Sequence, residues 1–267
     1  MSQCPVCNSS MPRAFQAKLL RKYEVSYYHC PQCGLLQTEP PYWLDEAYSD
    51  AIAVADTGLI RRNMKLSAKL VALFYFELGV KGAYLDVAGG YGMMTRLMRD
   101  FGFDFYWSDK YCQNLLARGF EADKASVPFN ALTAFEVLEH VHDPLAFVSE
   151  VMGDHGCRTL IFSTNLYQGP PPAMDWWYYA FNTGQHISFY QPQTLQRIAE
   201  RLGLKFFSAH GIHILTDQTI NKFRFNLLTG GLASPIASYV KRRIPSRMLP
   251  DHYALMNADP EIIKVDE

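Results

Sequence analysis

Short apolar runs alternate with helical patterns through the middle of the chain. The runs "AYLDVA", "FDFYWSD", "ALTAFE" and "TLIFST" have the length and composition of buried strands, whereas "MMTRLMRDFG" and "PLAFVSEVM" have helical spacing. This alternation is typical of a parallel sheet whose strands are connected by crossover helices. We therefore predict an α/β fold for residues 81–215.

The remaining sequence suggests three further parts. Residues 1–40 carry two cysteine pairs, and residues 41–80 hold a Pro- and aromatic-rich linker followed by a helical pattern that ends at Gly79. Residues 216–267 form a C-terminal extension with one basic run, "VKRRIPSR", for which a solvated face and a phosphate contact both stay open. Within the central part, "QPQTLQRIAERLG" predicts a helix, and "KFFSAHGIHILTDQ" supplies two short runs.

Charge and hydropathy do not indicate a large charged partner. The formal net charge of the 267 residues is −1, so nucleic acid or an anionic lipid surface would need a local basic patch. The start "MSQCPVCNSSMPR" has no apolar signal core, and "LVALFYFELGV" is about half of the ~20 residues that a membrane span needs. We expect a cytoplasmic protein without a membrane span.

Four of the six cysteines form two Cys-x-x-Cys pairs, "CPVC" and "CPQC". Thiolates with this spacing hold Zn²⁺ tetrahedrally, and matched pairs with a proline inside each argue against a redox dithiol or disulfides. Gly34 stands where the chain must turn tightly after the second pair. We predict a structural zinc ribbon with the ligands Cys4, Cys7, Cys30 and Cys33.

A nucleotide-binding pattern follows the first predicted strand. In "LDVAGGYG", Asp86 precedes a turn of small residues that opens a helix, as a nucleotide site between strand and helix requires. The next predicted strand ends in Asp109, about 20 residues further on, where a carboxylate can accept hydrogen bonds from ribose hydroxyls. Together these features predict that the chain binds a nucleotide.

Residues 80–210 resemble a class I methyltransferase that depends on S-adenosylmethionine (SAM). Asp86, Gly90 and Gly92 keep the family's first motif, while Ala88 replaces its first glycine. The resemblance implies a Rossmann-like seven-stranded sheet with "KFFSAHGIHILTDQ" as its closing antiparallel hairpin, and SAM as the cofactor, with Asp109 on the ribose. It also implies cofactor contacts further along the chain, namely Asp123 facing the adenine and Phe135 and Glu136 flanking the cofactor.

The segment "AFEVLEHVHDP" bears the candidate chemistry. If the chain is helical there, Glu136, Glu139 and His140 share one face. His140 is the natural general base for methyl transfer to a hydroxyl. A second reading takes these three residues with His186 as a site for Mg²⁺ or Mn²⁺, which the set resembles in small-RNA ribose methyltransferases. A third reading gives the segment no chemical role.

The segment "NLYQGPPPAMDWWYYAFNTGQH" is too long and irregular for a simple connection, and we expect it to cover the substrate. Stacking on a sugar ring or base is one role for its aromatic residues, and packing on the sheet is the other. The predicted substrate contacts in this segment are Trp176, Trp177, Tyr178, Tyr179 and Gln185.

The acceptor is the least constrained part of the function. A ribbon before such a domain resembles both nucleotide-sugar methyltransferases and ribosomal RNA methyltransferases, but residues 1–40 lack the basic and aromatic stripe that RNA stacking needs. We expect O-methylation of a small polyhydroxylated acceptor such as a sugar or sugar nucleotide. RNA methylation and a non-catalytic binding protein stay open as alternatives, and the oligomeric state is not indicated.

Overall fold

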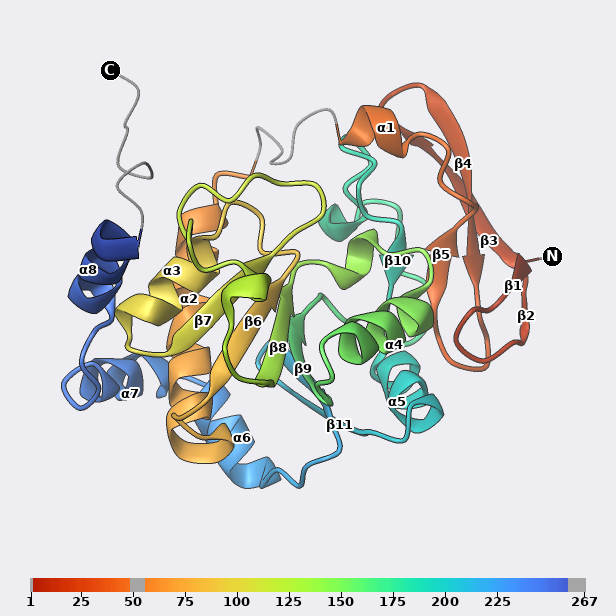
Figure 1. The fold of residues 1–267 in the computed structure, drawn as a ribbon. Coiled ribbons are helices and arrows are strands. Elements are labelled where there is room, and N and C mark those ends of the chain that lie inside the picture. The colour runs from red at the N-terminus through yellow and green to blue at the C-terminus, as the bar shows by residue number, and fades with distance from the viewer. Residues whose placement is uncertain (1, 49–55, 259–267) are drawn as a thin grey trace, which may run out of the picture. The chain divides into compact units, whose positions relative to one another are not determined.

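The computed structural model describes residues 2–48 and 56–258, so residues 49–55 of the predicted linker and 259–267 of the predicted extension lie outside the described residues (Figure 1). The chain divides into two compact units, each made of two stretches. The first unit comprises Met1–Asp56 with Leu132–Thr219, and the second comprises Thr57–Ala131 with Ile220–Glu267. This division differs from the predicted domain boundaries, which stay predictions.

The largest sheet has six strands in the order β11-β12-β9-β8-β6-β7. β6 and β7 are parallel, as are β8 and β9, whereas β12 is antiparallel to both β9 and β11. The sheet is therefore mixed, and the predicted α/β Rossmann-like class and closing hairpin are confirmed. Its strands are β6 (Ala83–Val87), β7 (Asp104–Ser108), β8 (Phe129–Phe135), β9 (Thr159–Ser163), β11 (Lys205–Ala209) and β12 (Ile212–Thr216).

The expected seventh strand is reduced to a single bridge. After β7, Trp107 pairs in parallel with Glu121 alone, and Ala122–Lys124 then form a 3-10 helix, η2. Alanine, aspartate and lysine are poor strand formers, so this edge does not extend into a regular ladder. The described sheet thus has six strands where the family resemblance implies seven.

Helices of the first unit begin at clear sequence signals. In α4 (Pro144–Asp154), the Asp143 side chain accepts a hydrogen bond from the amide of Ala146, and Pro144 occupies the first turn. α5 (Pro192–Arg201) follows a reciprocal pair of hydrogen bonds between Gln191 and Thr194. The predicted helix in "QPQTLQRIAERLG" is confirmed. The remaining helices of this unit are α1 (Leu44–Ala47), η3 (Leu138–His140) and η4 (Trp177–Tyr179).

The N-terminal residues form two small antiparallel sheets. β1 (Ser2–Gln3) pairs with β2 (Ser10–Met11). β3 (Arg13–Leu19), β4 (Tyr23–His29) and β5 (Leu36–Thr38) form a second sheet, whose fourth strand is β10 (Ser188–Phe189). The ribbon is therefore extended by a strand from much later in the sequence.

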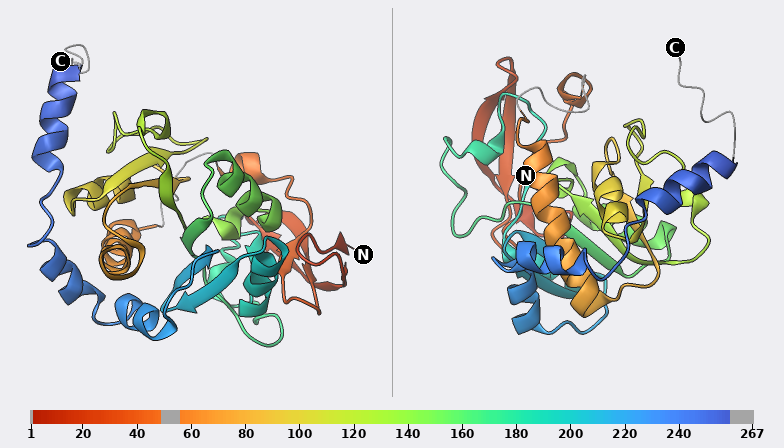
Figure 2. Two further views of the ribbon diagram at one scale, coloured as in Figure 1. Left: turned by 60° about the horizontal axis from the view of Figure 1, so that its bottom comes forward. Right: turned by 90° about the vertical axis from the view of Figure 1, so that its left-hand side faces the viewer.

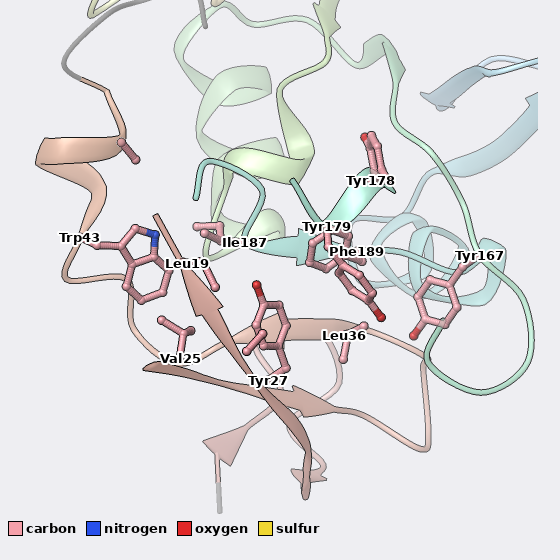
Figure 3. Packing of buried hydrophobic residues seen from close by; sticks show 12 residues of the cluster. Leu19, Val25, Tyr27, Leu36, Trp43, Tyr167, Tyr178, Tyr179, Ile187 and Phe189 are labelled. Atoms are coloured by element: carbon pink, nitrogen blue, oxygen red, sulfur yellow. The ribbon is translucent and has the colours of Figure 1, made fainter. Parts of the chain in front are cut away.

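A continuous core joins these parts of the first unit. Buried side chains from β3, β4 and β5 pack with aromatic residues of the segment 167–189 (Figure 3). Tyr27 of β4 lies 5.9 Å from Tyr179 and 6.3 Å from Phe189, measured between ring centroids. The predicted ribbon thus shares its core with the segment 167–189 of the same unit.

The second unit is mainly helical around β6 and β7. Its long helix α2 (Leu59–Leu73) continues into a π-helical turn, η1 (Phe74–Leu78), and stops at Gly79, where φ is +101°, so the predicted stop is confirmed. α2 packs against α6 and α7, as Figure 2 shows. The other helices are α3 (Met93–Asp100), α6 (Lys222–Thr229), α7 (Ala233–Val240) and α8 (Met248–Ala258).

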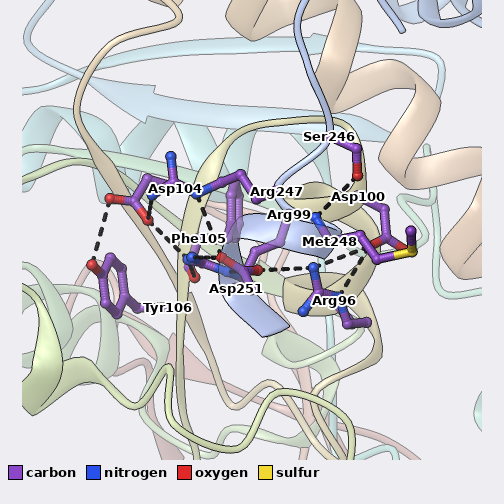
Figure 4. A network of polar contacts seen from close by, with 10 residues as sticks. All are labelled: Arg96, Arg99, Asp100, Asp104, Phe105, Tyr106, Ser246, Arg247, Met248 and Asp251. Atoms are coloured by element: carbon purple, nitrogen blue, oxygen red, sulfur yellow. Dashed lines mark hydrogen bonds and ion pairs between the residues drawn. The ribbon is translucent and has the colours of Figure 1, made fainter. Parts of the chain in front are cut away.

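A buried ion network connects α8 to α3 and β7 within the second unit (Figure 4). The guanidinium of Arg99, 2% exposed, donates to both carboxylate oxygens of Asp251 at 2.7 Å. It also donates to Asp104 at 2.8 Å and lies 3.6 Å from the ring centroid of Phe120. Arg247, from the basic run, bonds to Asp104 as well. The C-terminal extension is thus fixed to the second unit by charge and not by apolar packing alone.

None of the helices in the described residues is both long enough and apolar enough to cross a membrane.

Candidate active site

The loop between β6 and α3 has the backbone of a nucleotide turn. Ala88, Gly90 and Gly92 have φ of +54°, +55° and +87°. An L-residue in this left-handed region is strained, so Ala88 adopts a conformation that the family's glycine takes freely. The left-handed conformation is therefore present at this position although the side chain is alanine.

The loop also has room for a ligand on one side. A Cβ on Gly90 would meet nothing within 4 Å, whereas a Cβ on Gly89 would lie 2.8 Å from Trp107 and one on Gly92 would lie 2.9 Å from Asn114. The indole nitrogen of Trp107 donates to the Gly90 carbonyl at 2.8 Å, which holds this conformation. The residues present therefore fit a cofactor that approaches the backbone at Gly90.

Asp109 is less free than the sequence suggested. One of its oxygens accepts the amide of Gly90 at 2.9 Å, and the other accepts the amides of Tyr111 and Cys112 at 2.7 and 2.8 Å. A carboxylate offers about four acceptor positions, so little capacity is left for a ribose hydroxyl. Asp109 therefore orders the two loops around it, whether or not it also binds ribose.

The other predicted cofactor residues differ widely in exposure. Asp86 is buried at the end of β6, and Phe135 is half-buried at the end of β8. Asp123 stands exposed on η2, next to Lys124 at 3.7 Å. Whether these residues contact SAM stays a prediction.

The four predicted zinc ligands do come together. Their four sulfur atoms all lie within 4.8 Å of one another. The sulfurs of Cys4 and Cys33 are 3.6 Å apart, and those of Cys7 and Cys30 are 3.4 Å apart. Sulfurs at the corners of a tetrahedron with Zn–S bonds of about 2.3 Å are separated by about 3.8 Å. The cluster is consistent with a zinc ribbon.

The two cysteine pairs have matching backbones. Asn8 and Gly34, the residues directly after each pair, have φ of +60° and +74°. The Asn8 amide donates to the Cys4 carbonyl, and the Gly34 amide donates to the Cys30 carbonyl, both at 2.9 Å. Each pair thus forms the same tight turn, and the expected role of Gly34 is confirmed.

The segment after β8 brings together three of the four residues with candidate chemistry. Glu139, His140 and His186 each place one possible ligand atom within 4.8 Å of the others. Glu139 is fully buried, and neither of its oxygens has a hydrogen-bond partner among the described residues. A buried carboxyl group left in this way is costly unless something pairs with it.

Both histidines are held by backbone carbonyls. Nδ1 of His186 lies 2.7 Å from the Tyr178 carbonyl, and Nδ1 of His140 lies 3.0 Å from the Gln185 carbonyl and 2.7 Å from the Tyr48 hydroxyl. A carbonyl only accepts, so these contacts assign the proton to Nδ1 in each ring. The lone pair of each histidine therefore lies on Nε2.

Burial dominates the protonation equilibria of the cluster. Loss of solvent raises the pKa of Glu139 to about 8, and the charge of Glu136 adds to this rise. Burial lowers the pKa of His140 to about 3, with a contribution from His186. Both shifts favour the uncharged forms, and neutral His140 has a free Nε2 lone pair that can bind a cation or accept a proton.

Glu136 is not part of this cluster, which corrects the predicted helical face. β8 ends at Phe135, Glu136 has φ of +54°, and only Leu138–His140 form a short 3-10 helix. Because the chain is not α-helical from 136 to 140, the i, i+3, i+4 spacing does not apply. Glu136 instead accepts a hydrogen bond from the Ser163 hydroxyl.

Two of the expected substrate aromatics are core residues. Tyr178 and Tyr179 are 1% and 0% exposed and pack beside Phe189 (Figure 3). Rings this buried offer no free face to a ligand, which favours packing, the alternative role, for both. Their neighbour Trp177 is 73% exposed and Trp176 is half-buried, so these two keep a surface for substrate.

Gln185 has a different contact from the one expected. Its side-chain amide donates to the backbone carbonyl of Ala47 at 2.8 Å, and its backbone carbonyl accepts a hydrogen bond from His140. Tyr48, directly after α1, was missed by sequence reasoning because no motif surrounds it. Together, Gln185 and Tyr48 connect α1 to the histidine cluster.

Several solved structures of methyltransferases are distantly similar to the chain. Among solved structures, magnesium protoporphyrin IX methyltransferase from Synechocystis PCC 6803 with bound SAM is 16% identical, covers 64% of this chain and 87% of its own, and has a TM-score of 0.41. Mitomycin 7-O-methyltransferase is 16% identical, with coverages of 65% and 59% and a TM-score of 0.44. Human N-acetylserotonin methyltransferase with SAM is 14% identical, with 66% coverage of both chains and a TM-score of 0.41.

Sequence comparison gives the family directly. No curated protein matches the chain. The family described as "Methyltransferase domain" matches residues 60–209, more than half of the chain. The matched region includes the glycine turn, Asp109 and the Glu139, His140 and His186 cluster. The chain therefore belongs to this methyltransferase family, and it is a SAM-dependent methyltransferase.

Proposed function

We propose that the chain methylates a hydroxyl of a small polyhydroxylated acceptor, such as a sugar or sugar nucleotide, with a divalent cation at Glu139, His140 and His186. The observation that carries this proposal is the buried, unpartnered carboxyl of Glu139 beside two histidines whose Nδ1 atoms donate to carbonyls. Histidines that bind metals have this second hydrogen bond as a rule, because it fixes the tautomer and the ring orientation.

The donor set narrows the choice of ion. Two imidazoles and one carboxylate make a mixed nitrogen and oxygen site, which favours Mn²⁺ over Mg²⁺, since Mg²⁺ prefers oxygen ligands. Three protein ligands would leave room at such an ion for two neighbouring hydroxyls of an acceptor. The bound cation would lower the pKa of one hydroxyl, so that its proton could pass to solvent without a basic side chain.

The chain's own residues then have separate roles. The glycine turn would hold the cofactor, with Asp109 ordering the two loops around it, and SAM, when bound, supplies the methyl group from its sulfonium. Glu139, His140 and His186 would orient the acceptor hydroxyls. Trp176 and Trp177 keep enough surface to cover a sugar ring.

Binding of Mn²⁺ tests the proposal without knowledge of the acceptor. Electron paramagnetic resonance on zinc-loaded protein should show about one tightly bound Mn²⁺, and Glu139→Gln should weaken its binding by ~10²-fold or more, because a ligand is lost. Glu200→Gln, an exposed carboxylate of α5 paired with Arg197, is the matched control and should change nothing. Wild-type protein that binds no Mn²⁺ would refute the cation site.

Turnover assays separate the remaining alternatives. With sugar nucleotides that carry neighbouring hydroxyls, transfer of labelled methyl should stop in a chelator that leaves zinc in place and return with Mn²⁺. Activity that survives the chelator but falls ~10²–10⁴-fold in His140→Ala would favour the lone base instead. The same assay with short RNA ending in a free ribose tests the RNA alternative, because that ribose also has two neighbouring hydroxyls.

A further inference from the structure

The ribbon reaches the histidine cluster through one buried side chain, Gln37 of β5. Gln37 is 3% exposed, and its side-chain nitrogen donates to the Ser188 hydroxyl at 3.0 Å and to the His142 carbonyl. Ser188 follows His186 by two residues, and His142 follows His140 by two. One amide group therefore connects the two backbone segments that carry the histidines.

The surrounding backbone bonds follow the same path. Gln37 faces Ser188 in the pairing of β5 with β10, and the Thr38 amide donates to the Ile187 carbonyl at 3.0 Å. The Ile187 amide donates in turn to the carbonyl of Glu139 at 2.8 Å. Ile187, directly after His186, is therefore hydrogen-bonded both to the ribbon and to the backbone of Glu139.

The Ser188 hydroxyl completes the connection. It accepts from Gln37 and donates to the Val141 carbonyl at 2.6 Å, so it has a partner in each segment. These groups are buried, where a lost hydrogen bond is costly and geometry is held firmly. The zinc ribbon is therefore more than an attached module, because its third strand is part of the frame around the cluster.

We propose that Gln37 is a positioning residue that sets the separation of His140 and His186, whose ring centroids are 5.0 Å apart. This inference rests on the proposed cation site. Gln37 contacts neither the cation nor the acceptor, so it acts through the backbone of both histidines. The ribbon then contributes to ion affinity although its own cysteines lie elsewhere.

The test compares Mn²⁺ affinity in three variants of the full chain. Gln37→Met keeps the size but loses the donor, and Ser188→Ala breaks the same connection from its other end. Each should weaken Mn²⁺ binding about tenfold, which is the lower end of the losses seen when a group that supports a metal ligand is changed. The control is Thr159→Val. It removes an equally buried hydrogen bond, between the hydroxyls of Thr159 in β9 and Thr216 in β12.

The outcomes are distinct. Weaker Mn²⁺ binding in Gln37→Met and Ser188→Ala, with zinc content and SAM affinity unchanged and Thr159→Val like wild type, supports the inference. If Gln37→Met loses its zinc or does not fold, Ser188→Ala decides alone. Wild-type affinity in both variants, or equal weakening in Thr159→Val, overturns it. Absence of Mn²⁺ binding in the wild type refutes the cation site and this inference with it.

Discussion

Replacing Asp251 by asparagine should strongly destabilise the second unit. Asp251 is 4% exposed and accepts two hydrogen bonds from Arg99, itself 2% exposed. Breaking a buried pair by removing one charge costs ~3–5 kcal/mol, because the remaining charge stays desolvated. Asp104 still pairs with Arg99, so we expect about 2–4 kcal/mol.

Urea unfolding followed by circular dichroism measures this change, with the midpoint shift converted through an unchanged slope. Glu200→Gln, which breaks the exposed pair with Arg197, is the control and should cost less than ~0.5 kcal/mol. The double variant Arg99→Met with Asp251→Leu should recover much of the loss, because no lone charge remains. A cost for Asp251→Asn within ~0.5 kcal/mol of the control would refute the reasoning.

Three further predictions concern the rest of the chain. Burial lowers the pKa of His213 to about 4, so the unfolded state takes up a proton at higher pH than the folded state does. Lowering the pH from 6.5 to 4 should therefore reduce the free energy of unfolding by ~3 kcal/mol. Unfolding curves of His213→Asn should lack this loss. Ala88→Gly should raise stability by ~0.5–1 kcal/mol in urea, because left-handed strain in alanine exceeds the added chain entropy of glycine; a loss would contradict the φ of +54°. Cys30→Ser should lose the bound zinc by metal analysis and, through the shared core, change the near-ultraviolet signal of Tyr27 and Tyr179; zinc retained at full occupancy would contradict the four-cysteine site.

The sequence predicted those features that depend on local patterns. The alternation of apolar runs indicated the strands, Gly79 correctly marked the end of one helix, and the pattern "QPQTLQRIAERLG" located another. Cysteine spacing identified the four-cysteine cluster because four possible ligands in two short motifs are a local signal. The seventh strand was carried over from the family, and here the residues after Glu121 do not sustain it.

The parts that depend on distant contacts could not be predicted. β5 pairs with β10 over two residues of each strand. The paired residues Gln37 and Ser188 are 151 positions apart in the sequence, so no periodicity indicates the pairing. Burial of Tyr179 follows from that pairing, because the ribbon covers the ring. The left-handed backbone at Glu136 has no glycine to announce it, which is why a helical face was expected.

The shared core also explains why the ribbon belongs to the same folding unit as the histidine cluster. β3 and β4 bury Leu19, Val25 and Tyr27, but a sheet of this size has too little apolar surface to be stable alone without metal. Tyr179 and Phe189 complete its apolar face, and the same segment carries His186. Zinc at the four cysteines would stabilise the sheet on which β10 depends, and we expect removal of zinc to disturb His186 before it disturbs the glycine turn of the second unit.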